Sequence, residues 1–530
     1  MFHSRSLLRT AVLATTILSS AAYAQVTFHR GNDGDPETLD VQKTSVVSEA
    51  HLMRDLYDGL MIHNAKGEVT YGVAESHTLS ADGKVFTFKL RPNAKWSNGD
   101  AFKASDYVYS FRRIINPETG AKYANILYPL KNAEKINKKQ EGAKLEDLGV
   151  KAIDDRTLEI TLERSTPYFL ELLTHSTGFP VHPASVEKHG KDYVKPENWV
   201  SNGAYTLKSW TPNSDIRLDK NPNFHDAANV QIERIIYYPT PDFAAASRRF
   251  MAGELQFTTD IPADQVKFLK EKLGDQVKIA PYLGTYYLAF NMTKKPFDDV
   301  RVRQALSMVM DREFIAEQIW GGTMVPAYSF VPPGIGNYGK PAAAAWADKS
   351  PIEREDDAKK LLAAAGFGPG KPLKVEIRYN TTDNNRRTVV AVADQWKQIG
   401  VETTFINTDG KTHFAHLREG GDFDVARVGW IGDYSDPQNF LFLVQSDNTG
   451  FNYAKFKNLE YDGLMKQAEN ESDLKKRADV LFKAEQIFTR EQPYAPVLFY
   501  SSKNLVSPRL EGFHSNLRGA YATRFYTLKN

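Results

Sequence analysis

The chain of 530 residues contains no cysteine. Disulfide bonds, thiol nucleophiles and cysteine-based metal sites are therefore excluded, as is a lipid anchor on cysteine. Charge of one sign is also lacking, because 67 lysine and arginine residues face 65 aspartate and glutamate residues, for a net charge of +2. No strong field therefore indicates nucleic acid or an anionic membrane as a partner.

Motifs of the common enzyme classes are missing too. Neither H-E-x-x-H nor G-x-S-x-G occurs, and in GIGNYGKP (334–341) Pro341 replaces the Ser or Thr that would bind magnesium in a phosphate-binding loop. The twelve histidines are scattered, and we expect no metal site from the two closest groups. These groups are His175, His182 and His189, and His413 with His416. We expect no catalysis, no cofactor and no metal, although paired carboxylates are too plentiful to exclude an exported hydrolase.

The N-terminus has the pattern of an export signal. Arg5 and Arg9 precede an apolar run that ends in Ala22-Tyr23-Ala24, which is typical of a signal peptide cleaved after Ala24. The alternative is a membrane anchor, but the apolar run is shorter than the ~20 residues that a span needs. We therefore expect residues 1–24 to be removed and the protein to be periplasmic, with no stable membrane insertion.

Periodicity along the chain predicts an α/β protein. Period-two alternation indicates strands, and capping residues together with a glycine stop indicate helices. The expected strands are 84–90, 156–162, 373–379 and 401–407, and the expected helices are 350–366 and 387–399. The strand–helix–strand order of 373–407 predicts a largely parallel sheet. The length and the 42% hydrophobic content predict two or three domains.

Several stretches together resemble the periplasmic oligopeptide-binding proteins of ABC importers, in family 5 of the extracellular solute-binding proteins. They are VAESHTLSADGKVFTFKLRPNAKWSNGDAFKASDYVYSFRRI (73–114), LGVKAIDDRTLEITLERSTPYF, SNGAYTLKSW, PYLGTYYLAFNMTKKPFDDVRVRQALSMVMDRE (281–313) and FDVARVGWIGDYSDPQNFL. The resemblance runs in order along the mature chain. It implies a bilobal α/β fold with mixed sheets and a ligand enclosed between the lobes. Domain I would be 25–58, 183–283 and 501–530, domain II would be 59–182, and domain III would be 284–500.

The same resemblance implies a function. The protein would capture short oligopeptides by closure of its lobes and deliver them, as a monomer, to an inner-membrane ABC permease. Within this class the alternatives are dipeptides, murein tripeptide or a non-peptide nutrient, since fold alone does not fix the ligand. From other classes, a hydrolase and a chaperone-like binder of unfolded chains stay open.

The acidic residue in VGWIGDYSDP is central to the expected site. Asp433 matches the residue that meets the ligand ammonium in the family, whereas Asp436, before Pro437, is the natural turn residue. The preceding strand, 428–432, is suited to pair with an extended peptide. Gly429 and Gly432 would allow a close backbone approach.

Further ligand contacts are expected around this strand by resemblance. Arg418 and Arg427 match basic positions that would meet a ligand carboxylate, directly or through water, or would support Asp433. The alternative is a structural pair with a nearby carboxylate. Asn385 stands where relatives that take longer peptides can carry a histidine, and some relatives pair cysteines at the positions of Gly284 and Ile431. The full set of expected ligand-binding residues is Ser45, Val46, Val47, Tyr123, Tyr287, Asn385, Arg418, Arg427, Gly429, Trp430, Ile431 and Asp433.

Overall fold

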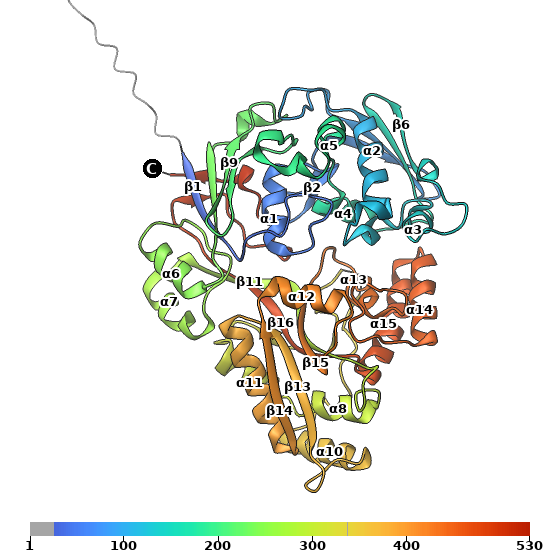
Figure 1. Cartoon of the computed structure of the whole chain (residues 1–530), viewed down its shortest axis with the longest axis vertical. Helices are drawn as coiled ribbons and strands as arrows, with labels where there is room; N and C mark the ends of the chain where they lie inside the picture. The colour runs from blue at the N-terminus through green and yellow to red at the C-terminus, as the bar shows by residue number, and fades with distance from the viewer. Residues whose placement is uncertain (1–25, 337, 530) are drawn as a thin grey trace, which may run out of the picture.

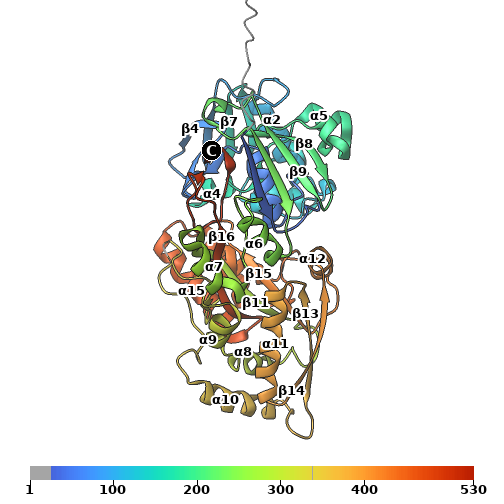
Figure 2. The same ribbon diagram turned by 90° about the vertical axis from the view of Figure 1, so that its left-hand side faces the viewer.

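The computed structural model describes residues 26–336 and 338–529, which form two lobes (Figure 1). The expected signal peptide, 1–24, lies outside the described residues. Both ends of the described chain lie in the upper lobe of Figure 1, close to β1 (Thr27–Asn32). In the perpendicular view of Figure 2 the two lobes again lie one above the other.

One sheet of the upper lobe joins the N-terminal strand to strands from much later in the chain. Its order is β1, β10 (Arg234–Pro239), β9 (Asp215–Lys220) and β8 (Tyr205–Thr211). β1 and β10 are parallel, and the other pairings are antiparallel. Alternate residues such as Ile235 and Tyr237 are fully buried, as expected for a half-buried sheet. Their apolar face packs in one core with α1 (Val47–Leu56).

The second sheet of the upper lobe is antiparallel and is covered by a helix. Its order is β4 (Ala74–Leu79), β5 (Val85–Leu90), β7 (Thr157–Thr161) and β6 (Val150–Asp154). Helix α2 (Ala104–Ile115) contacts β6 and β7. Phe86, Phe88 and Leu90 are buried on one face. The expected strands 84–90 and 156–162 are therefore confirmed to within a residue at each end.

The lower lobe contains a mixed sheet. Its order is β12 (Val325–Pro326), β16 (Tyr494–Leu505), β11 (Val277–Phe290), β15 (Val425–Ile431), β13 (Leu373–Asn380) and β14 (Val401–Thr408). Among the described residues β13 pairs in parallel with β14 and β15, whereas the other three pairings are antiparallel. The prediction of a largely parallel sheet is thus wrong. The local strand–helix–strand unit is parallel, but β11 and β16 enter the same sheet from distant parts of the chain.

The expected helices of the lower lobe are present. Helix α10 (Pro351–Ala364) begins after Ser350, whose hydroxyl accepts from the backbone N–H of Glu353 at 3.3 Å while the Glu353 carboxylate accepts from the backbone N–H of Ser350 at 2.9 Å. This reciprocal cap is the pattern that the sequence indicates. Helix α11 (Asp383–Gln398) begins four residues earlier than expected, because Thr382 caps it.

The remaining strands and helices complete the two lobes. The other strands are β2 (Met61–His63), β3 (Val69–Tyr71), β17 (Leu510–Glu511) and β18 (Thr527–Leu528). The other helices are α3 (Ala133–Asn137), α4 (Phe169–Leu172), α5 (Pro183–His189), α6 (Phe243–Met251), α7 (Val266–Leu273), α8 (Val300–Met308), α9 (Arg312–Phe314), α12 (Gly410–Arg418), α13 (Gln438–Leu441), α14 (Leu459–Asn470) and α15 (Leu474–Glu491).

The long strands β11 and β16 connect the lobes. Their register shifts between Pro281, which pairs with Ser501, and Thr285, which pairs with Phe499. This irregularity lies at the expected domain crossings 283/284 and 500/501, which it supports as proposed boundaries. After the crossing the last residues of the chain complete the upper lobe. There the backbone N–H of Thr523 donates to Asp55 and Arg524 pairs with Asp58, each at 2.7 Å.

Candidate functional site

A cavity of about 250 Å³ lies between the lobes. This volume is near the lower end of the roughly 300–1,000 Å³ common for small-ligand pockets. Ten of the twelve expected ligand-binding residues line it. They are Ser45, Val46, Val47, Tyr123, Tyr287, Arg418, Gly429, Trp430, Ile431 and Asp433. The cavity therefore joins a loop and helix of the upper lobe to the end of a central strand of the lower lobe.

Strand β15 has one paired edge and one partly unpaired edge. It pairs with β11 from Val425 to Ile431, but within the described residues it pairs with β13 only at Val425 and Ala426. Alternate N–H and C=O groups of an antiparallel strand point away from its partner. The edge of residues 428–431 is therefore available to an added strand, as expected for peptide pairing.

Glycines in and next to β15 make room for protein side chains. A Cβ atom on Gly429 would lie 2.4 Å from the Tyr500 hydroxyl, and one on Gly432 would lie 2.8 Å from Leu283. Gly284 lies opposite Ile431 in the register, and a Cβ there would lie 2.5 Å from the isoleucine side chain. The close approach expected for a ligand backbone at Gly429 and Gly432 is thus taken, on the Cβ side, by Tyr500 and Leu283. At the two positions where a cysteine pair is expected in some relatives, the glycine thus leaves space that the isoleucine side chain fills.

Asp433 lies at the end of β15 and is held by both lobes. Its carboxylate accepts from the Tyr123 hydroxyl at 2.6 Å and lies 3.2 Å from Nε2 of His175. Its backbone N–H donates to Asn439 at 2.8 Å, and the same amide oxygen accepts from the Trp430 indole at 3.2 Å. Each carboxylate oxygen has a further lone pair for a ligand ammonium.

The charge on Asp433 is stabilised despite its burial. Burial alone raises the pKa of this carboxyl. Interactions with His175, the hydrogen bond from Tyr123 and the charge of Arg518 outweigh that effect, so the pKa of Asp433 lies below its ordinary value of 3.8. Asp433 is therefore an ionised carboxylate in a largely enclosed cavity, where attraction to a cation is stronger than in water.

Aromatic rings form the wall beside this carboxylate. Tyr123 makes edge contacts with His175, Trp430 and Phe451 at ring distances of 5.0–6.2 Å. Tyr287 is almost completely buried and stacks on Tyr494 at 4.6 Å, so it is chiefly a core residue. Trp430 and Tyr123 are the better candidates for ligand contact.

Two expected residues lie away from the cavity. Arg427 donates to Asn380 at 2.9 Å and to the Tyr500 hydroxyl at 2.5 Å, and its guanidinium lies over the Tyr286 ring. The Asn385 amide donates to the backbone and side-chain oxygens of Asn380, both at 3.1 Å. Consecutive residues of a strand point to opposite faces, and Arg427 shares the Tyr500 face with Gly429. Neither Arg427 nor Asn385 lines the cavity, so their contact with a ligand stays a prediction. The partners of Arg427 are an amide and a hydroxyl, and not the carboxylate of the structural-pair alternative.

Asp436 is indeed a turn residue, since its side chain accepts from the backbone N–H of Gln438 at 2.9 Å. It also forms a buried two-point ion pair with Arg477 at 2.5 and 2.9 Å, which the sequence did not indicate. Asp436 is thus fully engaged within the lower lobe.

Several cavity residues were missed. They include Arg54, His63, His175, Tyr282 and Arg518. A helical spacing could have found Arg54, because Val47, Ala50 and Arg54 share one face of α1. Arg518 lies in the loop after β17, and no local pattern indicates it.

The histidines are engaged individually. His182 pairs with Asp100 at 3.1 Å, and His413 and His416 contact backbone carbonyl oxygens at 2.9 and 2.8 Å. Across residues 26–336 and 338–529, no group of three or more acidic residues and histidines is placed to hold a metal ion.

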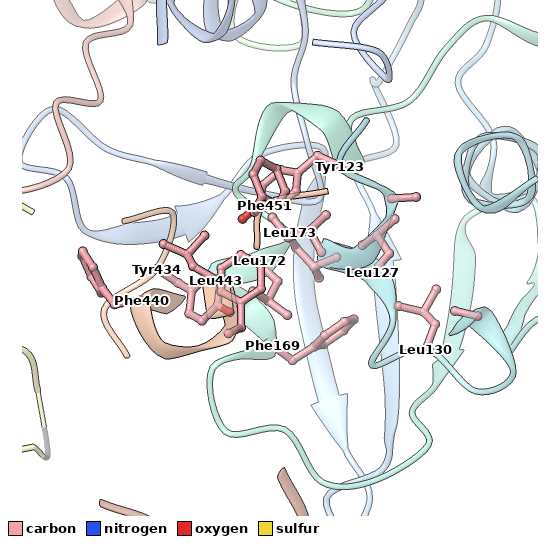
Figure 3. Packing of buried hydrophobic residues seen from close by; sticks show 14 of the residues in the cluster. Tyr123, Leu127, Leu130, Phe169, Leu172, Leu173, Tyr434, Phe440, Leu443 and Phe451 are labelled. Atoms are coloured by element: carbon pink, nitrogen blue, oxygen red, sulfur yellow. The ribbon is translucent and has the colours of Figure 1, made fainter. Parts of the chain in front are cut away.

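Contacts between the lobes continue beside the cavity. Glu171 accepts from the backbone N–H of Ser435 at 2.8 Å, and Tyr168 stacks on Tyr434 at 4.9 Å. Figure 3 shows side chains from residues 123–173 and 434–451 meeting in one apolar cluster. The lobes are thus in direct contact around the cavity.

Comparison with known proteins assigns the family. Residues 68–452 match the bacterial extracellular solute-binding proteins, family 5. The chain belongs to this family. The solute-binding protein is 37% identical over 542 residues to the periplasmic oligopeptide-binding protein OppA of Escherichia coli K12, which covers 99% of each chain.

Solved structures agree with this assignment. The murein tripeptide-binding protein MppA of Escherichia coli superposes with a TM-score of 0.91 at 36% identity, over 95% of this chain and 98% of that one. OppA of Haemophilus influenzae in complex with RPPGFSPFR also gives 0.91, at 32% identity, over 96% and 99%. The bilobal α/β fold with mixed sheets is therefore confirmed.

The comparison also distinguishes two arrangements of the lobes. The unliganded open form of MppA gives a TM-score of only 0.70 at the same 36% identity, over 95% of this chain and 97% of that one. Since sequence and coverage hardly change, the difference lies in how the lobes are placed. The solute-binding protein therefore has a more closed arrangement than that open form. Among its described helices none is both long and apolar enough to span a membrane.

Proposed function

We propose that this protein captures short peptides in the periplasm by closing its lobes around them and delivers them to an inner-membrane ABC permease. One observation carries the proposal: an ionised Asp433 follows a strand whose second edge is unpaired by described residues at 428–431, inside a cavity between the lobes. An extended peptide would pair with residues 428–431 and place its N-terminal ammonium at Asp433. The OppA and MppA relatives support this ligand class.

In this proposal the protein acts as a monomer and catalyses no reaction. The family is one of binding proteins. Contacts that stabilise a substrate and its transition state equally do not lower the barrier to a reaction. Peptides should therefore be recovered intact after incubation with the protein, as judged by mass spectrometry. Cleaved peptides would favour the hydrolase alternative.

Native mass spectrometry of the purified protein tests the ligand class. We expect co-purified short peptides, or binding of added peptides of two to five residues with a rise in melting temperature. N-acetylation should abolish most of that rise, because the acetylated terminus leaves Asp433 without a cation. If no peptide binds, or if only long unfolded chains bind, the proposal is wrong.

A further inference from the structure

Three arginines line the cavity: Arg54, Arg418 and Arg518. Arg54 lies in the last turn of α1, and Arg518 lies in the loop that follows β17. Within the described part of the chain neither of these two guanidinium groups makes an ion pair or a hydrogen bond. Nη1 of Arg54 and both Nε and Nη1 of Arg518 are buried without a partner.

The backbones that carry the two side chains are fixed. Leu283 of β11 donates its N–H to the carbonyl oxygen of Leu517 at 2.9 Å, and the side chain of Asn516 accepts from the N–H of Arg518 at 3.2 Å. The Tyr282 ring lies so close to Gly519 that a Cβ there would be 2.8 Å from it. Arg518 is therefore held against β11 and is not a mobile surface residue.

Helix α1 is anchored equally well. The carboxylate of Glu49 accepts from the backbone N–H of Ser45 at 2.8 Å, and the N–H of Ala50 donates to the carbonyl oxygen of Val46 at 3.1 Å. These contacts fix the first turn of the helix. They also fix the direction in which Val47, Ala50 and Arg54 face the cavity.

The acids near these arginines are already engaged. Asp433 accepts from Tyr123 and contacts His175, and Glu171 accepts from the backbone of Ser435. Burial lowers the pKa of both Arg54 and Arg518, and the charge of Arg518 lowers that of Arg54 further. Both arginines are partly buried, and a buried guanidinium nitrogen without a hydrogen-bond acceptor is destabilising unless a ligand supplies one.

The charge of the wall is unbalanced. Arg54, Arg418 and Arg518 contribute three positive charges, whereas Asp433 contributes one negative charge. The ammonium of a peptide would meet Asp433 and leave the arginines unmatched. A planar guanidinium suits a carboxylate, with which it makes two parallel hydrogen bonds.

We propose that Arg54 and Arg518 form an anion subsite that binds one carboxylate of the ligand. This inference rests on the proposed peptide-binding function. The carboxylate comes either from an acidic side chain or from the C-terminus of the peptide.

Titration calorimetry of the full mature chain with matched tripeptides tests the subsite. Ala-Ala-Ala variants with Glu or Gln at the first, second or third position measure the role of a side-chain carboxylate. The same peptides as free acids and as C-terminal amides measure the role of the terminal one. We expect the wild type to prefer one carboxylate form by about tenfold or more, as is common for a charge-assisted pair in a cavity.

Arg518→Gln should reduce that preference to about threefold or less, because the remaining arginine cannot hold the carboxylate from both sides. If Arg518→Gln loses the preference for Glu over Gln, the bound carboxylate is that of the side chain. If it loses the preference for the free acid over the amide, the bound carboxylate is that of the C-terminus. Arg54→Lys and Arg518→Lys keep the charge but not the two-point geometry, and should give intermediate preferences. These lysine variants also test the subsite if Arg518→Gln does not fold.

Arg386→Gln is the matched control. Arg386 lies on α11, is paired with Asp383 at the surface and is not part of the cavity wall. Its loss should leave every preference unchanged. If peptides bind but Arg518→Gln and the lysine variants keep the wild-type preferences, the anion subsite is refuted while the peptide function stands. If no peptide binds at all, the proposed function fails and the subsite fails with it.

Discussion

Two cavities lie between the lobes, and they differ in how their charges are satisfied. Tyr123 and Phe451 line both. The larger, of about 420 Å³, is bordered by closed ion pairs, with Arg477 bound to Asp436 and Arg164 bound to Glu469 at 2.6 Å. The smaller, of about 250 Å³, contains the Asp433 carboxylate, together with Arg54 and Arg518, some of whose buried nitrogens have no partner among the described residues.

The charged residues of the two cavities therefore differ in role. Those of the larger cavity stabilise the fold, and those of the smaller cavity are the proposed ligand contacts. Asp433 and Asp436 are three residues apart in one loop. Asp436 forms an ion pair with Arg477, whereas the Asp433 carboxylate faces a cavity and has lone pairs left for a ligand. We therefore propose that the smaller cavity, and not the larger one, holds the ligand. A partly buried charge without a protein partner is a better indicator of a ligand site than the volume of the cavity.

The largest effect is expected from the closed pair of the larger cavity. Arg477→Met leaves the Asp436 carboxylate buried and unpaired, so it should lower the free energy of unfolding by about 3–5 kcal/mol. Denaturant unfolding measures this loss. Lys138→Met, at a partly exposed pair with Asp447, should cost less than about 1 kcal/mol. If Arg477→Met also abolished peptide affinity in the folded fraction, the distinction between the cavities would break down.

Asp433→Asn should act on binding and not on folding. It removes the charge that meets the ligand ammonium, which costs about 2–5 kcal/mol, or at least 30-fold in affinity. Calorimetry with a free and an N-acetylated peptide measures it, and the variant should bind the two almost equally. Asp479→Asn, exposed on α15, is the control. A variant that still preferred the free peptide would remove Asp433 from its proposed role.

Contacts that hold the lobes together should change affinity without changing specificity. Arg164 and Glu469 join the lobes but are partly exposed, so Glu469→Gln should cost only about 0.5–1 kcal/mol. The affinity for free and acetylated peptides should fall by the same factor, about two- to fivefold. Unequal factors would mean that this pair contacts the ligand.

The smallest effect is expected from pH near neutrality. The lowered pKa of Asp433 keeps it ionised, so its contribution is complete above its ordinary value of 3.8 and is lost as pH falls below that value. A peptide ammonium loses its proton near pH ~8. Affinity should therefore vary little between about pH 5 and 7 and weaken on both sides. A fall in affinity already between pH 7 and 5 would contradict this account.

Local patterns predicted the local elements, and distance along the chain explains what they missed. The strands 84–90 and 373–379 and the helix 350–366 follow from periodicity and capping within a few residues. The mixed sheet does not, because β11 and β16 pair across more than half of the lower lobe's sequence. No window of neighbouring residues contains that pairing.

The site divides in the same way. Asp433 and Trp430 were predicted because one contiguous motif carries them. Arg427 belongs to the same motif but lies on the other face of the strand, where it donates to Tyr500. The motif alone does not show which face of the strand meets Tyr500. His175 and Arg518 reach the cavity from segments far from this motif in sequence, so only the assembled fold brings them together.

The return of the chain to the upper lobe has a consequence for how the protein is made. Asp55 and Asp58 near the start are completed by Thr523 and Arg524 near the end. Synthesis adds about 5–20 residues per second, so the N-terminal core waits roughly half a minute or more for its last partners. Contacts so distant in sequence also form slowly. A nascent chain would thus stay incompletely folded until its final residues emerge, which is compatible with the export that the proposed periplasmic function implies.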